Sequence, residues 1–220
     1  MRTRFDEQLD SLNRDIIEMG GLCEATIAAA AKSLVEGDIA LAKQVQEYSE
    51  KIDEKEREIV ATCIKLLLQQ HPVASDLRII SSALKMVTDM ERIGDQSADI
   101  AEIVTMANIK ADDDTLGIDD MAKAVIKMVT DSIDAFVKRD TAIAESVIEY
   151  DDVVDGHFRR IKQILVERLS KPEYHGEFAL DLLMISKYFE RIGDHAVNVA
   201  GWVLYSVTGS REGKTAPDMC

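Results

Sequence analysis

The sequence predicts an all-α fold, and three properties of its composition and patterning support this. Proline and glycine are scarce, with three prolines and 11 glycines in 220 residues. Aromatic residues make up only 5% of the chain, whereas apolar residues as a group make up 46%. Short strands joined by turns would need more turn-forming residues than this. We therefore expect long helices with a core built between their apolar faces.

Six helices are expected, and the residues between them explain where each one ends. Gly37 followed by Asp38 provides a C-terminal glycine for one helix and an N-cap for the next. Pro72 and Pro172 each interrupt a periodic segment, because proline cannot continue a helix. The aspartates 112–114 break the pattern between the halves. The expected helices span about residues 5–36, 38–70, 73–110, 118–138, 140–170 and 175–207.

The chain consists of two copies of one sequence unit. A shift of 102 positions superposes Asp53 on Asp155, and the pentapeptide ERIGD occurs once in each half. Each copy contains three of the expected helices. We therefore predict two pseudo-symmetric three-helix bundles packed into one elongated six-helix body. The expected repeats span residues 1–111 and 112–220, and the second ends in a frayed tail.

The charge balance and the cysteines restrict the class of protein. Aspartate and glutamate number 41 against 26 lysines and arginines, a net charge of −15, so we expect no nucleic-acid partner. Cys23, Cys63 and Cys220 have no CxxC spacing and are interpreted as reduced thiols of a cytoplasmic protein. No apolar run has the length of a membrane span, so we expect no membrane insertion.

An apolar line on the third expected helix of each half turns acidic. In the first half, the helical line that ends at Val87 continues into Glu91, Asp95 and Asp99. Like charges four residues apart repel one another, so a cation is expected to face them. The equivalent line of the second half contains Glu190, Asp194 and Asn198.

Two kinds of cation could face these lines, and the sequence leaves both open. One is an arginine from the same helix or a neighbour, such as Arg92, Arg191, Arg57 or Arg159, in an interhelical salt bridge. The other is a metal ion, because carboxylates one helical turn apart can reach a cation lying beside the helix. Carboxylate oxygens suit iron, manganese, magnesium or calcium.

The second expected helix of each unit supplies further acids. In the second half, Asp151 and Asp155 stand four residues apart, one helix before ERIGD. In the first half the same positions hold Ser49 and Asp53, so one acid is missing. If metal binds, the second site is predicted to be the better one.

These motifs resemble those of the PhoU family. The resemblance rests on the two ERIGD copies, each followed at the next turn by Asp or Asn, on the second-helix acids, and on the segment DLRIISSALKMVTDMERIGD. It covers nearly the whole chain. It implies a cytoplasmic, often dimeric protein of two three-helix bundles. It also implies a negative regulator of the phosphate-starvation response that links the ATPase subunit of a phosphate ABC transporter to a phosphate-sensing membrane histidine kinase.

The same resemblance implies metal clusters on the bundle surface. Iron is the metal implied first, with manganese, zinc or magnesium as alternatives, and a homodimer is the implied assembly. Ser49 departs from the acidic pattern of the family and puts the full size of the first cluster in question. The positions that match the family's metal-binding motifs are Asp53, Glu91, Asp95, Asp99, Asp151, Asp155, Glu190, Asp194 and Asn198.

The alternative class is an enzyme with a carboxylate-bridged pair of metal ions in a helical bundle. Such enzymes use Glu-x-x-His on facing helices, and that motif does not occur in the sequence. Phosphate-binding glycine loops and a nucleophile elbow are also missing from the sequence. We therefore expect a protein that is not an enzyme. A purely structural adaptor with salt-bridged acids is the third interpretation.

Overall fold

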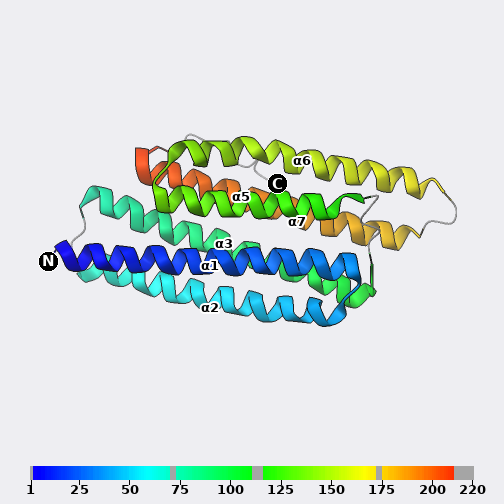
Figure 1. Ribbon diagram of the computed structural model, residues 1–220, viewed down its shortest axis with the longest axis horizontal. Coiled ribbons are helices and arrows are strands. Elements are labelled where there is room, and N and C mark those ends of the chain that lie inside the picture. Colours follow the sequence, from blue (N-terminus) through cyan, green and yellow to red (C-terminus); the bar gives the residue numbers. More distant parts are fainter. Residues whose placement is uncertain (1, 70–72, 111–115, 172–174, 211–220) are drawn as a thin grey trace.

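The chain folds into long helices, as the sequence predicts (Figure 1). The computed structural model describes residues 2–69, 73–110, 116–171 and 175–210, and these residues contain no β-strand. The all-α prediction is therefore confirmed. The helices are α1 (Arg2–Glu36), α2 (Ile39–Gln69), α3 (Ala74–Ala107), α5 (Ile118–Lys138), α6 (Thr141–Leu169) and α7 (Gly176–Thr208).

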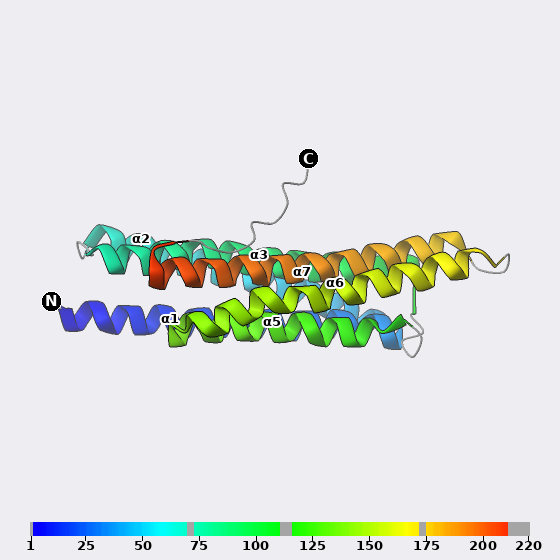
Figure 2. The ribbon, with the colours of Figure 1, turned by 90° about the horizontal axis from the view of Figure 1, so that it is seen from above.

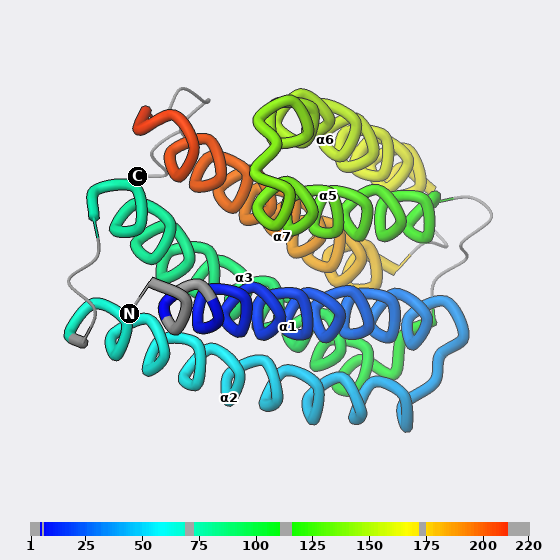
Figure 3. Tube along the Cα trace, turned by 60° about the vertical axis from the view of Figure 1, so that its left-hand side comes forward, coloured from blue at the N-terminus to red at the C-terminus, as the bar shows by residue number. Residues whose placement is uncertain are grey.

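The helices form two three-helix bundles that share one long interface. Helices α1, α2 and α3 pack against one another, and so do α5, α6 and α7. Helices α3 and α7 pack against each other more extensively than any other pair, and a second contact joins α1 to α5. In Figure 3, α3 and α7 accordingly run through the middle of the body, with α2 and α6 on the outside. Figure 2 shows the elongated shape that results.

Caps explain several of the helix ends, and every end lies within three residues of its predicted position. Asp38 accepts hydrogen bonds from the amides of Ala40 and Leu41 at 2.9 and 3.0 Å, the expected N-cap. Gly37 has a φ of +68°, in the left-handed region that favours glycine. Helix α3 ends earlier than predicted because Asn108 adopts a φ of +47° and stops it. Pro72 and Pro172 lie outside the described residues.

Equivalent apolar residues are buried beneath the acidic lines of both bundles. The residue that precedes ERIGD, Met90 in α3 and Phe189 in α7, is fully buried in each half. The glycine of each ERIGD brings the preceding helix close. A Cβ on Gly94 would lie 3.0 Å from Ile52 of α2, and one on Gly193 would lie 3.3 Å from Val154 of α6. The carboxylates of neighbouring helices are thereby held side by side.

The bundles differ in how far their first helix reaches. Helix α1 has 35 residues and α5 only 21. Figures 1 and 2 both show α6 and α7 extending past the N-terminal end of α5. This tip carries exposed apolar side chains, among them Val166, Leu180 and Met184. Within the described residues, none of the helices is both long enough and apolar enough to cross a membrane.

Candidate metal centre

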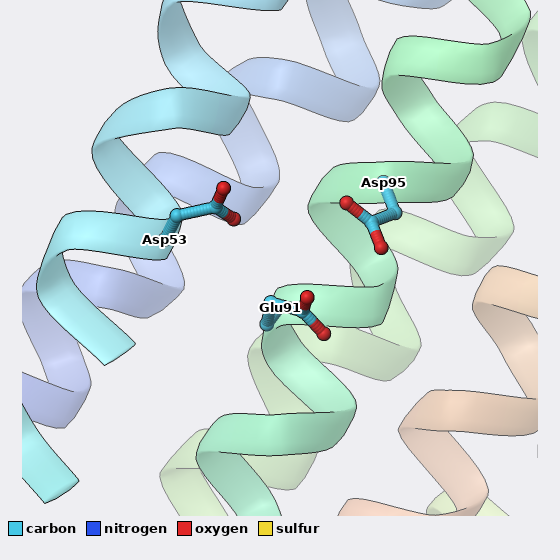
Figure 4. Close-up of side chains that lie close together, drawn as sticks. All are labelled: Asp53, Glu91 and Asp95. Carbon is cyan, nitrogen blue, oxygen red and sulfur yellow. The ribbon is translucent and has the colours of Figure 1, made fainter. Parts of the chain in front are cut away.

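Three carboxylates from two helices meet in the first bundle. Asp53 extends from α2 toward α3, where Glu91 and Asp95 stand one turn apart (Figure 4). One oxygen from each side chain lies within 4.8 Å of one oxygen of the other two. We call this group the first cluster. In the described part of the chain, no other three histidine, cysteine or acidic side chains bring ligand atoms this close.

The first cluster concentrates negative charge in a partly buried place. Burial raises the pKa of Asp53, and the charges of Asp95 and Glu50 add to this effect while Arg57 opposes it. Burial likewise raises the pKa of Glu91, with a further contribution from Asp95. Both carboxylates would therefore be stabilised by a cation placed between the helices.

One oxygen of the first cluster lacks a partner. Oδ1 of Asp53 is inaccessible to solvent and accepts no hydrogen bond from the residues that the structure describes. A buried carboxylate oxygen without a partner is costly, and a bound cation would satisfy it. The donor set of three carboxylates also fits a hard or intermediate divalent ion. The residues present therefore fit a metal ion.

Arginine also contributes to the first cluster, as the salt-bridge explanation requires. Nε of Arg92 lies 3.4 Å from Glu91 and Nη1 lies 3.6 Å from Asp95. These contacts involve acids of its own helix, and the Arg92 side chain is 56% exposed. Exposed pairs of this kind contribute little to stability. Arg92 therefore screens Glu91 and Asp95 from the solvent side, and no ion pair joins it to Asp53 within the described residues.

Four carboxylates of the second bundle, two from α6 and two from α7, act on one another electrostatically, although no three of them bring oxygens within 4.8 Å of one another. Burial raises the pKa of Asp151 to about 6, and the charges of Asp194, Asp155, Asp152 and Glu190 add to this. The pKa of Asp194 is raised as well, mainly by burial and by the charge of Glu190. Lys187 and His195 oppose this increase. The second cluster consists of Asp151, Asp155, Glu190 and Asp194.

A lysine already pairs with the second cluster. The ammonium of Lys187, one turn before Glu190 in α7, contacts the Glu190 carboxylate directly. The Glu190 side chain is only 17% exposed, and that of Lys187 is 31% exposed. The ammonium also lies 5.6 Å from the ring centroid of Phe158 on α6, a cation–π contact. Lys187 is thus held between α6 and α7.

The last residue of each predicted line lies at the interface between the bundles. Burial and the charges of Asp95 and Glu102 raise the pKa of Asp99, and Arg191 of α7 opposes them. The Asn198 side chain donates a hydrogen bond of 3.3 Å to Asp89 of α3. Asp99 therefore lies outside the close group of the first cluster, and Asn198 faces α3. All nine predicted positions are partly buried.

Sequence reasoning did not select Asp89, which joins the two bundles. Its Oδ1 accepts the bond from Asn198 and lies 3.0 Å from Nδ1 of His195. A shift of 99 positions relates α3 to α7, so Asp89 corresponds to Tyr188. This difference between two otherwise matching repeats is the sequence feature that could have indicated a special role for Asp89. Lys187, which corresponds to Thr88, breaks the repeat in the same way.

The fold and the clusters define a class of protein: a duplicated three-helix-bundle protein with carboxylates displayed on paired helices. The sequence profile of the PhoU domain matches residues 16–104 and 118–203. The chain belongs to the PhoU domain family.

Relatives of similar length support this membership. A Pseudomonas aeruginosa protein named phosphate-specific transport system accessory protein PhoU homolog is 34% identical, with 94% of this chain and 86% of that protein covered. A Clostridium acetobutylicum protein of the same name is also 34% identical, with 96% and 97% covered.

Solved structures show the same fold. The crystal structure of PhoU from Pseudomonas aeruginosa superposes with a TM-score of 0.85 at 32% identity, covering 94% of this chain and all of that one. The crystal structure of the phosphate transport system regulatory protein PhoU from Streptococcus pneumoniae also gives 0.85, at 27% identity, covering 94% and 98%. These family members are described as accessory or regulatory proteins.

Proposed function

We propose that this protein is an accessory regulator of phosphate transport and represses the phosphate-starvation response when phosphate is abundant. The observation that carries the proposal is the match along nearly the whole chain to relatives named as accessory proteins of phosphate-specific transport. Such a protein works by binding partners. We propose that it acts in the cytoplasm, between the ATPase subunit of a phosphate ABC transporter and a phosphate-sensing histidine kinase.

The proposed adaptor role fits the shape and surface of the molecule. A body built on the long α3–α7 interface is a rigid support for partner surfaces. The exposed apolar side chains at the tip formed by α6 and α7 are candidates for partner contacts. These exposed apolar side chains could also contact a second copy of the chain, and we propose a homodimer as the assembly. A single molar mass of twice the chain mass, measured by light scattering, would support the dimer.

We propose further that both clusters bind metal ions, with iron first and manganese, zinc or magnesium as alternatives. Asp53, Glu91 and Asp95 would hold the ion of the first cluster. Asp151, Asp155, Glu190 and Asp194 would hold that of the second, with Asp99 and Asn198 next to the two sites. A bound cation would neutralise the carboxylates and join α2 to α3, and α6 to α7, across their contact.

Elemental analysis tests the metal proposal. The full chain should be purified without a metal-affinity tag and without chelator, beside Glu91→Gln/Asp95→Asn and Glu190→Gln/Asp194→Asn. Each double variant should lose the metal of its own cluster and keep that of the other. Circular dichroism establishes that both variants remain helical. Metal content unchanged in a folded variant would refute the assignment of that cluster.

A gene deletion tests the regulatory proposal independently of metal. In the native host grown in high phosphate, deletion should release alkaline phosphatase from repression. Complementation with wild type should restore repression, and complementation with the two double variants shows whether regulation needs the clusters. Continued repression in the deletion strain would contradict the regulatory role.

The second candidate is the carboxylate-bridged di-metal enzyme. Paired carboxylates on facing helices favour it, but the chain has no Glu-x-x-His motif. His195, next to Asp194, has its Nδ1 directed to Asp89, at 3.0 Å. We therefore propose regulation and not catalysis. Oxygen consumption by protein loaded with ferrous iron, beyond one turnover per site, would favour the enzyme instead.

A further inference from the structure

Two of the differences between the second cluster and the first have opposite charge. Asp151 replaces Ser49 and adds a carboxylate, and Lys187 replaces Thr88 and adds an ammonium. The second cluster thus contains four carboxylates and the ammonium of Lys187, whereas the first contains three carboxylates, two of which Arg92 contacts from the solvent side. The charges of Asp151 and Lys187 offset each other.

The surroundings of Lys187 keep its ammonium in the cluster. The ammonium contacts Glu190 and lies 5.6 Å from the centroid of the Phe158 ring. In the first bundle the position of Phe158 is taken by Glu56, whose charge instead raises the pKa of Glu91. Thr88 is exposed, and its hydroxyl bonds to the carbonyl of Leu84 in its own helix, 3.2 Å away. The cation of the first cluster is instead Arg92, which contacts Glu91 and Asp95 with a side chain that is 56% exposed, against 31% for Lys187.

We infer that Lys187 is an internal cation that takes the charge position of a metal ion in the second cluster, so that an entering metal must displace it from Glu190. The inference rests on the proposed metal binding. Its consequence is that the second cluster, despite its additional carboxylate, binds metal more weakly than it would without the lysine. The protein then has one cluster open to metal and one in which metal exchanges with an amine of the chain.

Displacement has a simple structural route. The Lys187 side chain is long and partly exposed, so its ammonium can leave Glu190 and the Phe158 ring and turn to solvent. Metal binding therefore requires a change at one side chain and no movement of a helix. It also makes the Lys187 amine more accessible, which provides a signal separate from the metal itself.

Titration with Mn²⁺ tests the inference on the full chain. In the Glu91→Gln/Asp95→Asn background only the second cluster remains, and adding Lys187→Thr should tighten Mn²⁺ binding by about tenfold. Lys187→Met keeps an unbranched side chain without the charge and should have the same effect if Lys187→Thr fails to fold. The matched control is Thr88→Lys in the Glu190→Gln/Asp194→Asn background, which should weaken Mn²⁺ binding at the first cluster.

Lysine acetylation, read by mass spectrometry, provides the second measurement. Saturating Mn²⁺ should speed the acetylation of Lys187 several-fold, while the exposed Lys162 on α6 serves as internal reference.

The inference would be overturned if both lysine variants bound Mn²⁺ within twofold of the parent and Mn²⁺ left the reactivity of Lys187 unchanged. That result would leave the metal proposal intact. If Mn²⁺ binds to neither single-cluster protein, the metal proposal itself fails and the inference fails with it.

Discussion

The two clusters occupy equivalent places on equivalent scaffolds, yet their electrostatics differ. In the first cluster an arginine contacts the acids from the solvent side, and a buried Asp53 oxygen accepts no hydrogen bond from the described part of the chain. In the second, a partly buried lysine contacts Glu190, and Asp151 has a pKa of about 6. Duplication thus preserved the backbone that displays the acids while the neighbouring side chains diverged.

The equivalent arginines show the same divergence. Arg92 contacts Glu91 and Asp95 in its own helix. Arg191 follows the glutamate of the second ERIGD. Its charge opposes the rise in the pKa of Asp99 across the bundle interface, and its Cζ lies 5.9 Å from the centroid of the Tyr188 ring. One arginine therefore screens a cluster, and the other helps to join the bundles. Identical motifs need not have identical contacts.

The largest expected effect tests whether the two scaffolds are equivalent. Phe189 and Met90 are fully buried at corresponding positions. Phe189→Ala should lower the free energy of unfolding by about 4 kcal/mol and Met90→Ala by about 3 kcal/mol, through cavity formation. Urea denaturation followed by circular dichroism measures both. Phe189→Met, which installs the residue of the first bundle, should cost less than about 1.5 kcal/mol. A loss below about 1 kcal/mol for Phe189→Ala would contradict the equivalence.

A smaller effect should follow from restoring the missing acid of the first cluster. Ser49 is 7% exposed, so Ser49→Asp places a carboxylate in a buried position beside other acids. Without metal at pH 7.5, the variant should lose about 2 kcal/mol of stability. Mn²⁺ should raise its melting temperature more than that of wild type. Ser49→Asn, similar in size but uncharged, is the control, and equal stability of the two variants would contradict the argument.

The raised pKa of Asp151 predicts how stability depends on pH. Its pKa is about 6 in the folded protein against 3.8 ordinarily, so folding favours the protonated acid. This contribution is fully present below about pH 4 and is lost as the pH rises through 6. Metal-free Asp151→Asn should therefore be more stable than wild type at pH 7.5, by about 1 kcal/mol after allowance for solvent screening.

Denaturation of metal-free protein at pH 4 and 7.5 checks this sign. The advantage of Asp151→Asn should vanish at pH 4, where the wild-type acid is protonated as well. With Mn²⁺ present at pH 7.5 the order should reverse, because Asp151 then serves as a ligand. If Asp151→Asn is still more stable than wild type at pH 4, the difference in stability comes from the shape of the side chain and not from its charge.

The sequence was sufficient to predict the fold because the repeat and the helix caps were explicit. Two ERIGD copies, a recurrent pattern at a shift of 102, and the cap at Asp38 together predict six helices in two units. The meeting of Asp53 with Glu91 and Asp95 was likewise predictable, since acids four residues apart lie on one face and adjacent helices of a bundle pack together.

The remaining features of the site could not be read from the sequence, for geometric reasons. Each step of four residues turns about 40° around a helix, so Asp99 lies about 80° from Glu91 and approaches α7. The same turn brings Asn198 to Asp89 on α3. The contact of Lys187 with Glu190 depends on a side-chain rotamer and on Phe158 of another helix. The packing of the helices determines the rotamer of Lys187 and its distance from Phe158.

The smallest expected effects come from the two ERIGD glycines, and they measure how closely the helices approach each other. Replacing a mid-helix glycine by alanine gains about 1 kcal/mol in helix propensity. Gly156→Ala should show this gain in full, because a Cβ there meets nothing within 4 Å. Gly193→Ala should gain less, since its Cβ would lie 3.3 Å from Val154 and 3.4 Å from Oδ1 of Asp151.

Gly94→Ala should gain the least, because its Cβ would lie 3.0 Å from Cδ1 of Ile52, closer than any contact at Gly193, so that methyl group must shift. The expected order of unfolding free energies is therefore Gly156→Ala, then Gly193→Ala, then Gly94→Ala, over a range of about 1 kcal/mol. Urea denaturation of the metal-free proteins measures this order.

Mn²⁺ binding distinguishes Gly193 from Gly94 further. Gly193→Ala places a methyl group in van der Waals contact with Oδ1 of Asp151 and should weaken binding at the second cluster by limiting the movement of that ligand, whereas Gly94→Ala meets Ile52 and should leave the first cluster unchanged. Equal losses of affinity would mean that both glycines are needed for helix approach alone, and that neither makes room for a carboxylate.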